Sequence, residues 1–234
     1  ADKDEFGLAK SSISVYRGKL GVGTSEPKAA LTVMDEVGEL EEFPPRAMSN
    51  YETFMEGHGV FKVTYSPWLS SGVYQEPAWQ AFDNSGSYHN NIWHSERNET
   101  TVNGYYTGTD GAYAGTNSLG GILGDYVILE SPYKTKITKI NLKGRHSGTD
   151  TLTGQTVKAF YFMASNDNVT WDILTQKDNL TGWTVQGYTF DIPNTKYYKY
   201  YAIVPTKGNL SYVTLSELRY FGTREQGAST LHNG

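Results

Sequence analysis

Flat aromatic side chains stand in the expected loops of this chain, where they are available for binding. Trp68, Trp183, Tyr105 and Tyr106 all lie in segments rich in Gly, Ser, Thr and Asn. An indole or phenol ring offers an apolar face on which a sugar ring can stack, and tyrosine gives a large contact area at low entropic cost. These four residues are candidate ligand contacts. The alternative is that they cover the edge of the fold.

Polar side chains suited to a hydroxyl group or a carboxylate lie in other expected loops. Arg145 and His146 directly follow the alternating apolar segment Thr138–Lys143, and His89 lies in a long stretch, 84–124, that is rich in Tyr, Gly and Asn. Arg presents a planar fork of N–H donors, and His can donate a hydrogen bond to a hydroxyl. We add these three residues to the candidate ligand contacts, with a plain surface-loop position as the alternative.

No residue pattern of this chain is typical of a catalytic site. There is no Cys, so thiolate metal sites, disulfides and cysteine nucleophiles are excluded. His89 and His94 are five residues apart, which is not the spacing of a helical zinc site, and neither His-Glu-x-x-His nor Gly-x-Ser-x-Gly occurs. The glycines of 120–124 precede an expected strand rather than open a helix, so they form no phosphate-binding loop. We predict that the chain is not an enzyme.

Composition and charge narrow the class of protein further. The net charge of −5 and the pI of about 5.6 argue against a nucleic-acid partner, which requires clustered Lys and Arg. No apolar stretch approaches the ~20 residues that cross a bilayer, so we expect no membrane insertion. The 18 Tyr and 25 Gly fit many short strands joined by exposed loops. The composition therefore favours an all-β protein.

The apolar segments read as strands and not as helices. Val157–Ala164 is apolar at both odd and even positions, as expected of a central strand with both faces buried, and no stretch has a helical period. The Asn- and Asp-rich segment Ser165–Trp171 then predicts a tight turn into the next strand. We predict a β-sandwich or jelly roll. The candidate strands are Val60–Tyr65, Asp125–Glu130, Thr138–Lys143, Val157–Ala164, Trp171–Leu174, Tyr188–Ile192, Tyr198–Val204 and Thr214–Phe221.

The sequence predicts a small segment ahead of one main domain. Residues 1–46 contain short alternating segments and glycine turns but too few apolar residues for a core, and they end in an acidic stretch and the pair Pro44-Pro45. A Pro pair cannot continue a helix or a central strand, so we place the linker there. The main domain then covers 47–222, and 223–234 is an extended tail.

Within the first segment, Gly21-Val22-Gly23-Thr24-Ser25-Glu26-Pro27-Lys28-Ala29-Ala30-Leu31-Thr32-Val33 resembles a short repeat of phage tail fibres and of proteins of large viruses. The resemblance implies a small N-terminal β stem that packs against copies of itself in a trimeric shaft. An edge strand packed on the main domain is the alternative.

Motifs of the main domain occur in a recognisable order. They are Ala81-Phe82-Asp83-Asn84, Trp93-His94-Ser95, Gly124–Leu129, Lys136–Leu142 followed by Arg145, Ser165–Trp171, Tyr198–Val204, and Leu215-Ser216-Glu217-Leu218 followed by Phe221-Gly222. This series resembles the discoidin-like, coagulation factor type C family, which includes the galactose-binding-like carbohydrate-binding modules of family 32. The resemblance implies an eight-stranded jelly-roll sandwich that binds sugars, lipid headgroups or proteins through loops at one end.

The chain departs from the family pattern at three points. Tyr126 replaces a Trp, Ile128 stands where an Asp precedes Leu129, and the stretch between Ser95 and Gly124 is longer than usual. The absence of Cys favours the bacterial or viral branch of the family.

The resemblance also implies one structural Ca²⁺. Its ligands would be the carbonyl of Gln80, the side chain of Asp83, the region of Asn91, the carbonyl of Ser216 and the side chain of Glu217. Carboxylate and carbonyl oxygens are the ligands that Ca²⁺ prefers. The alternative is that Asp83 caps a turn and Glu217 pairs with Lys or Arg.

Three functions remain open at this stage. The first is a lectin-like domain at a virion surface, extracellular to the host, which mediates attachment of a virus or phage to host cell-surface glycans as a homotrimer. The second is a structural protein of the virion or fibre that makes protein contacts without binding sugar. The third is an accessory carbohydrate-binding module of a glycoside hydrolase.

Overall fold

The computed structural model describes two compact units, which divide the chain between Glu39 and Leu40. No helix in the described part of the chain is long and apolar enough to span a membrane. The described residues are 13–16, 19–22, 31–33, 40–66, 70–71, 74–75, 77–85, 91–95, 101–102, 105–106, 117–147, 151–152, 156–208 and 213–225.

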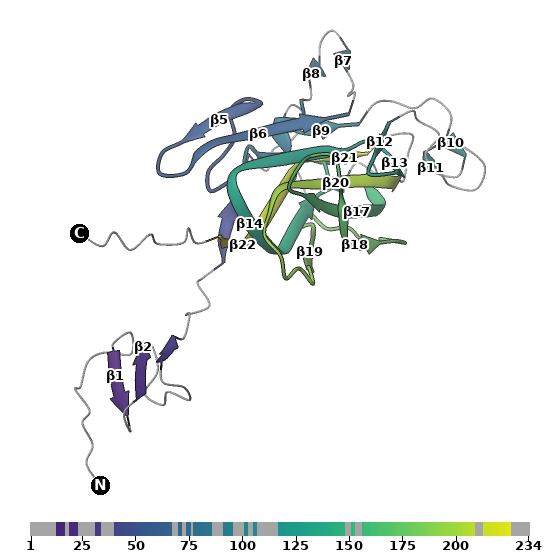
Figure 1. Cartoon of the computed structure of the whole chain (residues 1–234). Coiled ribbons are helices and arrows are strands. Elements are labelled where there is room, and N and C mark those ends of the chain that lie inside the picture. The colour runs from purple at the N-terminus through teal and green to yellow at the C-terminus, as the bar shows by residue number, and fades with distance from the viewer. Residues whose placement is uncertain are drawn as a thin grey trace. The chain divides into compact units, whose positions relative to one another are not determined.

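The first unit contains a small three-stranded sheet (Figure 1). Its strands are β1 (Ile13–Tyr16), β2 (Lys19–Val22) and β3 (Leu31–Val33). β1 and β2 pair antiparallel, and β2 and β3 pair in parallel. These strands coincide with the short alternating segments of the sequence.

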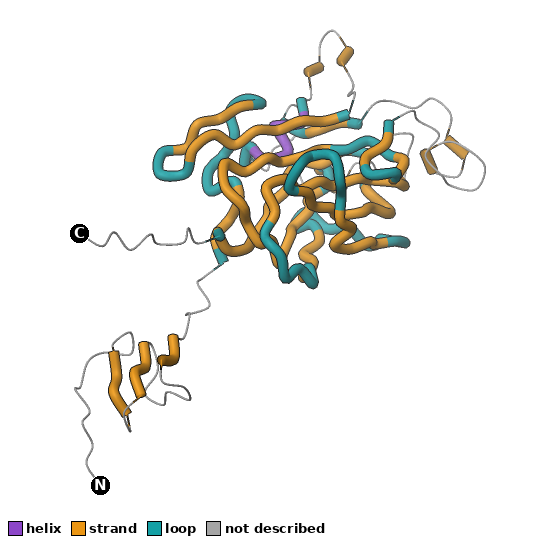
Figure 2. Tube along the Cα trace, viewed as in Figure 1, coloured by secondary structure: helices purple, strands orange, loops and turns teal. Residues whose placement is uncertain are grey.

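The second unit is nearly all β, as predicted (Figure 2). Its one described helical segment is the 3-10 helix η1 (Ala78–Phe82). The main strands are β4 (Glu41–Phe43), β5 (Glu52–Met55), β6 (Gly59–Tyr65), β14 (Val127–Lys143), β17 (Val157–Ser165), β18 (Asp172–Lys177), β19 (Tyr188–Asp191), β20 (Tyr198–Gly208) and β22 (Glu217–Arg224). The short strands are β7 (Ser70–Ser71), β8 (Tyr74–Gln75), β9 (Trp93–His94), β10 (Thr101–Val102), β11 (Tyr105–Tyr106), β12 (Ser118–Leu119), β13 (Ile122–Leu123), β15 (His146–Ser147), β16 (Thr151–Leu152) and β21 (Thr214–Leu215).

The long strand β14 belongs to both layers of a sandwich. Its first part, Val127–Glu130, pairs with β6 on one side and β20 on the other. Its second part, Thr135–Lys143, pairs with β22, and within that part Lys139–Leu142 also pairs with β19. The larger layer therefore has the order β5-β6-β14-β20-β17-β18, and the smaller layer has the order β4-β22-β14-β19.

Consecutive long strands alternate between these layers. β14 ends in the smaller layer, β17 and β18 lie in the larger, β19 in the smaller, β20 in the larger and β22 in the smaller. This alternation confirms the predicted jelly-roll β-sandwich. The sequence nevertheless predicted two strands, Asp125–Glu130 and Thr138–Lys143, where β14 is one strand. The register shifts between Glu130 and Thr135, around Pro132, and the chain passes from one layer to the other there.

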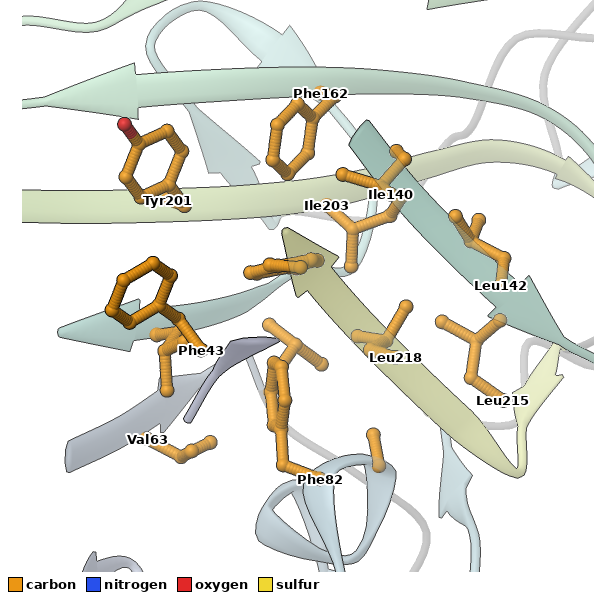
Figure 3. Packing of buried hydrophobic residues seen from close by; sticks show 14 of the residues in the cluster. Phe43, Val63, Phe82, Ile140, Leu142, Phe162, Tyr201, Ile203, Leu215 and Leu218 are labelled. Carbon is orange, nitrogen blue, oxygen red and sulfur yellow. The ribbon is translucent and has the colours of Figure 1, made fainter. Parts of the chain in front are cut away.

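The hydrophobic core fills the space between the layers (Figure 3). Phe162, Tyr201 and Ile203 come from the larger layer and face residues of the smaller one, such as Ile140 and Leu218. All five are at most 1% exposed. Burying side chains of this size at about 25 cal/mol per Å² of apolar surface is the main stabilising contribution to such a fold.

The outer face of the larger layer is apolar as well. Ile128, Met163, Ala202 and Val204 form a second cluster together with Leu119 of β12. The short antiparallel hairpin β12–β13 therefore covers this face. Burial on both faces confirms the prediction that β17 is a central strand, because its apolar residues occupy both parities.

The sandwich begins earlier in the sequence than the expected start at Ala47. β4 pairs with β22, and Phe43 is 1% exposed within the core. Glu42, at the end of the acidic stretch, accepts hydrogen bonds from Nε and Nη2 of Arg219 at 2.7 and 2.5 Å. The stretch that we expected to be a linker thus ends in a strand of the sandwich. At the other boundary, β22 continues past Gly222 to Arg224.

Candidate functional site

Several long connections of the sandwich meet at one end of it, which we call the loop end. Val127, at the start of β14, lies opposite Tyr65 of β6 and Ile203 of β20. Val157, at the start of β17, lies opposite Gly208 at the end of β20. The larger layer therefore directs to this side the ends of β6 and β20 and the starts of β14 and β17. Figure 1 shows the course of these strands.

Trp183 shows that the smaller layer ends on the same side. Its indole N–H donates a hydrogen bond to the carbonyl of Val157 at 2.9 Å, and its ring meets the edge of Tyr188 at 5.0 Å. Tyr188 lies opposite Leu142, close to the end of β14. The loop end consequently receives the connections that follow β6, η1, β14, β18 and β20.

Arg145 lies at this end on a fixed backbone. The carbonyls of Lys143 and Gly144, just before it, accept hydrogen bonds from the N–H and the hydroxyl of Ser216, both within 3.0 Å. Directly after it, His146 opens the β15–β16 pair, opposite Leu152. The backbone on both sides of Arg145 is thus fixed, by the corner before β22 and by a short hairpin, and the Arg145 side chain is half-buried.

The other predicted contacts have different outcomes. Tyr105 and Tyr106 form β11, and Tyr105 lies opposite Lys207 near the end of β20, so the backbone brings this pair to the loop end. Trp183 is half-buried against the core, which fits the alternative that it covers the edge of the sandwich. Trp68 and His89 lie outside the described residues, and of His146 only the backbone is described.

The predicted calcium ligands come together around η1. The N–H of Asn84 donates a hydrogen bond to Oε1 of Glu217 at 3.2 Å, which brings the residue after Asp83 to the start of β22. Glu217 is only 3% exposed. Ser216 precedes it, and Asn91 lies just before β9, which pairs with β21.

Several side-chain oxygen atoms at this corner are buried or partly buried. Gln80 is 8% exposed, and its buried Oε1 has no hydrogen-bond partner. Burial raises the pKa of Asp83, while hydrogen bonds from Ser85 act against that shift. A cation bound here would offset the cost of burying the side-chain oxygen atoms of Gln80 and Glu217 and of partly burying those of Asp83. No group of three or more His, Asp or Glu side chains that could hold a metal occurs among the described residues, so amide and carbonyl oxygens would complete the set.

The alternative role of this corner also has support. The N–H of Ser85 donates to Oδ1 of Asp83 at 2.9 Å, so Asp83 does cap a turn.

A cavity of about 40 Å³ adjoins the corner. It is lined by Glu42, Pro44, Pro45, Arg46, Phe82, Asn84, Glu217 and Leu218.

Asp125 is a structural residue of the loop end that no sequence pattern identified. Its side chain is 1% exposed, and Oδ1 accepts hydrogen bonds from Ser66 Oγ at 3.1 Å and from Asn117 Nδ2 at 2.8 Å. Ser66 Oγ in turn accepts the N–H of Tyr126 at 2.9 Å. The carboxylate ties the segment after β6 to the β12–β13 hairpin. The only signal in the sequence is a charged residue at the start of an apolar strand.

The strand pairing defines the class of protein as an antiparallel jelly-roll sandwich with a loop end. No family model matches the chain, and no curated protein sequence matches it.

Several solved structures are similar. The CpGH89CBM32-5 protein of Clostridium perfringens, solved with GalNAc-β-1,3-galactose, is 17% identical at a TM-score of 0.48, over 69% of this chain and 95% of its own. The C-terminal domain of a chitobiase from Bacteroides fragilis is 19% identical at 0.48, over 75% and 99%. The fucolectin of striped bass (Morone saxatilis) serum is 13% identical at 0.47, over 70% and 47%.

Proposed function

We propose that this chain is a non-catalytic carbohydrate-binding protein whose sandwich holds a glycan at the loop end. The observation that carries the proposal is the placement of Arg145, β15 and the tyrosine strand β11 at that end. The class of ligand follows from the ordered motifs, which resemble those of carbohydrate-binding modules. The fold supplies a rigid base, and the loops supply the specificity.

The side chains at the loop end supply complementary interactions. The guanidinium of Arg145 can donate two parallel hydrogen bonds to vicinal hydroxyls or to a carboxylate. Tyr105 and Tyr106 bring aromatic rings that suit stacking on a sugar. No reacting group is required, because the glycan is held and released unchanged.

Attachment of a virion or phage to host-cell glycans is the biological role that we propose. The fibre-like segment 21–33 supports it, because a trimeric stem would present three weak binding sites together. Linked sites raise the overall affinity by mass action without any new contact.

Calcium is part of the same proposal. Asp83, Glu217, Gln80, Ser216 and the region of Asn91 would hold the ion by their oxygen atoms. Bound there, Ca²⁺ would join the end of η1 to the start of β22. The ion would stabilise the fold, and it would not contact the glycan.

A glycan array with the full chain tests the binding proposal. Arg145→Ala should lower binding at least about tenfold, since a hydrogen bond to a charged group contributes about 1.5–3 kcal/mol. Lys134→Ala is the matched control, because it removes one positive charge at the bend of β14, away from the loop end. Uniform binding to every glycan by wild type and both variants would reject the lectin function and leave a structural fibre protein.

Thermal unfolding with calcium or with a chelator tests the ion. We expect calcium to raise the midpoint, because a ligand at one hundred times its Kd stabilises the folded state by about 2.7 kcal/mol. Asp83→Asn should abolish the rise, whereas Asp191→Asn, an exposed change at the end of β19, should leave it intact. An unchanged midpoint in the wild-type protein would reject a structural ion.

A further inference from the structure

Both chain connections of the sandwich lie at the end opposite the loop end. β4 opens the unit and β22 closes its described part, and Glu41 lies opposite Gly222 in their antiparallel pair. The N–H of Glu225 donates to the carbonyl of Lys134 at 2.9 Å, in the bend of β14. Interactions that hold this corner together therefore also hold the first and last strands of the described sandwich in place.

Four side chains from four elements meet at this corner, and we call them the His58 junction. His58 comes from the β5–β6 turn, Tyr133 from the bend of β14, Arg224 from β22 and Glu41 from β4. Nη2 of Arg224 lies 3.0 Å from Nδ1 of His58 and 3.4 Å from Oε2 of Glu41. The hydroxyl of Tyr133 lies 2.7 Å from the same Nδ1.

The donors at this junction define the state of His58. A guanidinium has no acceptor atom, so Nδ1 of His58 must accept from Arg224 and can carry no proton. The imidazole is therefore neutral, with its proton on Nε2, and the hydroxyl of Tyr133 also donates to Nδ1. Protonation at Nδ1 would turn the acceptor into a donor that faces the guanidinium of Arg224, which cannot accept, and leave only the hydroxyl of Tyr133 as a partner.

The junction is connected to the core as well as to the chain ends. Arg224 stacks over the ring of Tyr133, with its Cζ 4.2 Å from the ring centroid. Tyr133 meets Phe43 of β4 and Phe61 of β6 edge-on, each at 6.2 Å between centroids. A shift of Arg224 would therefore change the packing of side chains from β4, β14 and β22.

The charges around His58 act mostly against its protonation. Burial lowers the pKa of His58, and the positive charges of Arg224 and Arg46 act in the same direction, whereas Glu41 acts against them. Arg46 follows β4 in the sequence. A protonated His58 would repel Arg224 and attract Glu41, and the ion pair between those two would be exchanged for a new one.

We propose that the His58 junction is a pH-sensitive switch: neutral His58 holds the outer ends of β4 and β22 together, and protonation of His58 releases them. The released state keeps the sandwich, because most of the core residues do not contact the junction, and it loosens only the corner formed by β4 and the end of β22. A mildly acidic compartment would then change how firmly β4 and the end of β22 are held within the sandwich, without changing the loop end.

The sign of the effect follows from the direction in which the pKa moves. The pKa of His58 is lowered from 6.5, so the junction contributes its full stability above about pH 6.5, where the unfolded chain is also neutral. That stability is lost as the pH falls through the lower pKa of the folded protein. Lowering the pKa by one corresponds to about a tenfold change in the ratio of the closed to the open junction.

Amide hydrogen exchange of the full chain at pH 7.5 and pH 5.0 tests the switch. After correction for the intrinsic pH dependence of exchange, amides of 41–43 and 222–225 should lose protection at pH 5.0, and those of β17 should not. The loss should be about tenfold for each pH unit by which the folded pKa of His58 lies below 6.5.

Two variants of His58 separate the switch from simple packing. In His58→Asn, the side-chain oxygen takes the place of Nδ1 and does not titrate, so the amides of 41–43 and 222–225 should stay protected at both pH values. His58→Phe retains a ring without an acceptor, so the same amides should be weakly protected at both.

Two results would overturn the switch. The first is that amide protection of 41–43 and 222–225 depends on pH equally in wild type and in His58→Asn. The second is a His58 ring resonance, followed by NMR in the wild-type protein, that titrates at or above pH 6.5. The comparison of wild type with His58→Asn remains decisive even where His58→Phe fails to fold.

Discussion

Tyr201 joins the two layers of the sandwich through one hydroxyl group. The side chain is 1% exposed, and its hydroxyl donates to the carbonyl of Thr135 and accepts the N–H of Ile137. Burial raises the pKa of Tyr201 to about 12, so the group stays protonated and able to donate. Because Thr135 and Ile137 follow the bend of β14, the hydroxyl holds the corner where the strand changes layers.

Tyr201→Phe should lower the free energy of unfolding by about 1–3 kcal/mol. The ring and its packing on Phe162 remain, but a buried N–H and a buried carbonyl lose their partner. Tyr200→Phe, one position away and only half-buried on the outer face, should change stability by less than about 0.5 kcal/mol. Urea unfolding of the three proteins measures both values. Equal stability of wild type and Tyr201→Phe would show that water or another group forms hydrogen bonds with the carbonyl of Thr135 and the N–H of Ile137.

Single residues were predictable where their role depends on neighbours in the sequence. The position of Arg145 could be predicted because it follows an alternating strand, and its backbone lies at the loop end, while its role as a ligand contact stays a prediction. Asp125 could not be identified, because its partners, Ser66 and Asn117, come from segments that only the fold brings together. For Trp183 the sequence left open a ligand contact or a cover of the sandwich edge, because the partner of its indole N–H is the carbonyl of Val157, 26 positions away.

The turn between β17 and β18 is held by one carboxylate. Oδ1 of Asp167 accepts the N–H groups of Val169 and Thr170 at 2.9 and 2.7 Å and the hydroxyl of Ser165 at 2.9 Å. The bonds from Thr170, then Val169, then Ser165 lower the pKa of Asp167 to about 2. Hydrogen bonds of this kind favour the ionised form over the protonated one.

The turn should therefore lose stability in acid. A carboxylate with a folded pKa of about 2 and an ordinary value of 3.8 stabilises the fold above pH 4, and this contribution disappears as the pH falls through 2. NMR titration of the wild-type protein should show the Asp167 carboxyl ionising near pH 2. Asp167→Asn should unfold at a lower urea concentration at pH 5 and depend less on pH between 5 and 2.5. A measured pKa near 3.8 would contradict the hydrogen bonds to this carboxylate.

Strands and tight turns could be predicted from local sequence patterns. Features that depend on contacts between distant segments could not. The segment Ser165–Trp171 was predicted correctly as a turn, since Asn and Asp bond to their own backbone. The continuity of β14 was not, because Pro132 at the corner signals an end of regular pairing. The cover provided by β12–β13 escaped prediction as well, because Leu119 and Ile122 become apolar cover only against the second cluster on the larger layer.

The two ends of the sandwich carry different groups of residues. Arg145 and β11 lie at the loop end, while β4 and the end of β22 lie at the opposite end with the His58 junction. The residues proposed to contact a glycan and the first and last strands of the described sandwich therefore lie at opposite ends of this unit.

The start of the folded sandwich can be tested by truncation, because β4 belongs to it. A fragment Leu40–Gly234 should unfold like the full chain's second unit, whereas a fragment Ala47–Gly234 lacks Phe43 and the Glu42–Arg219 pair. Removing a buried phenylalanine alone costs about 3–5 kcal/mol, and the bidentate pair, which is partly exposed, adds at most about 1 kcal/mol.

We therefore expect Ala47–Gly234 to be less stable than Leu40–Gly234 by at least about 3 kcal/mol in urea. Phe43→Ala in the longer fragment should reproduce most of this loss, since the side chain is 1% exposed and packs on Tyr133. Leu40→Ala, at a side chain 43% exposed, is the matched control and should cost little. Equal stability of the two fragments would mean that the sandwich closes without β4 and that the acidic stretch is a linker after all.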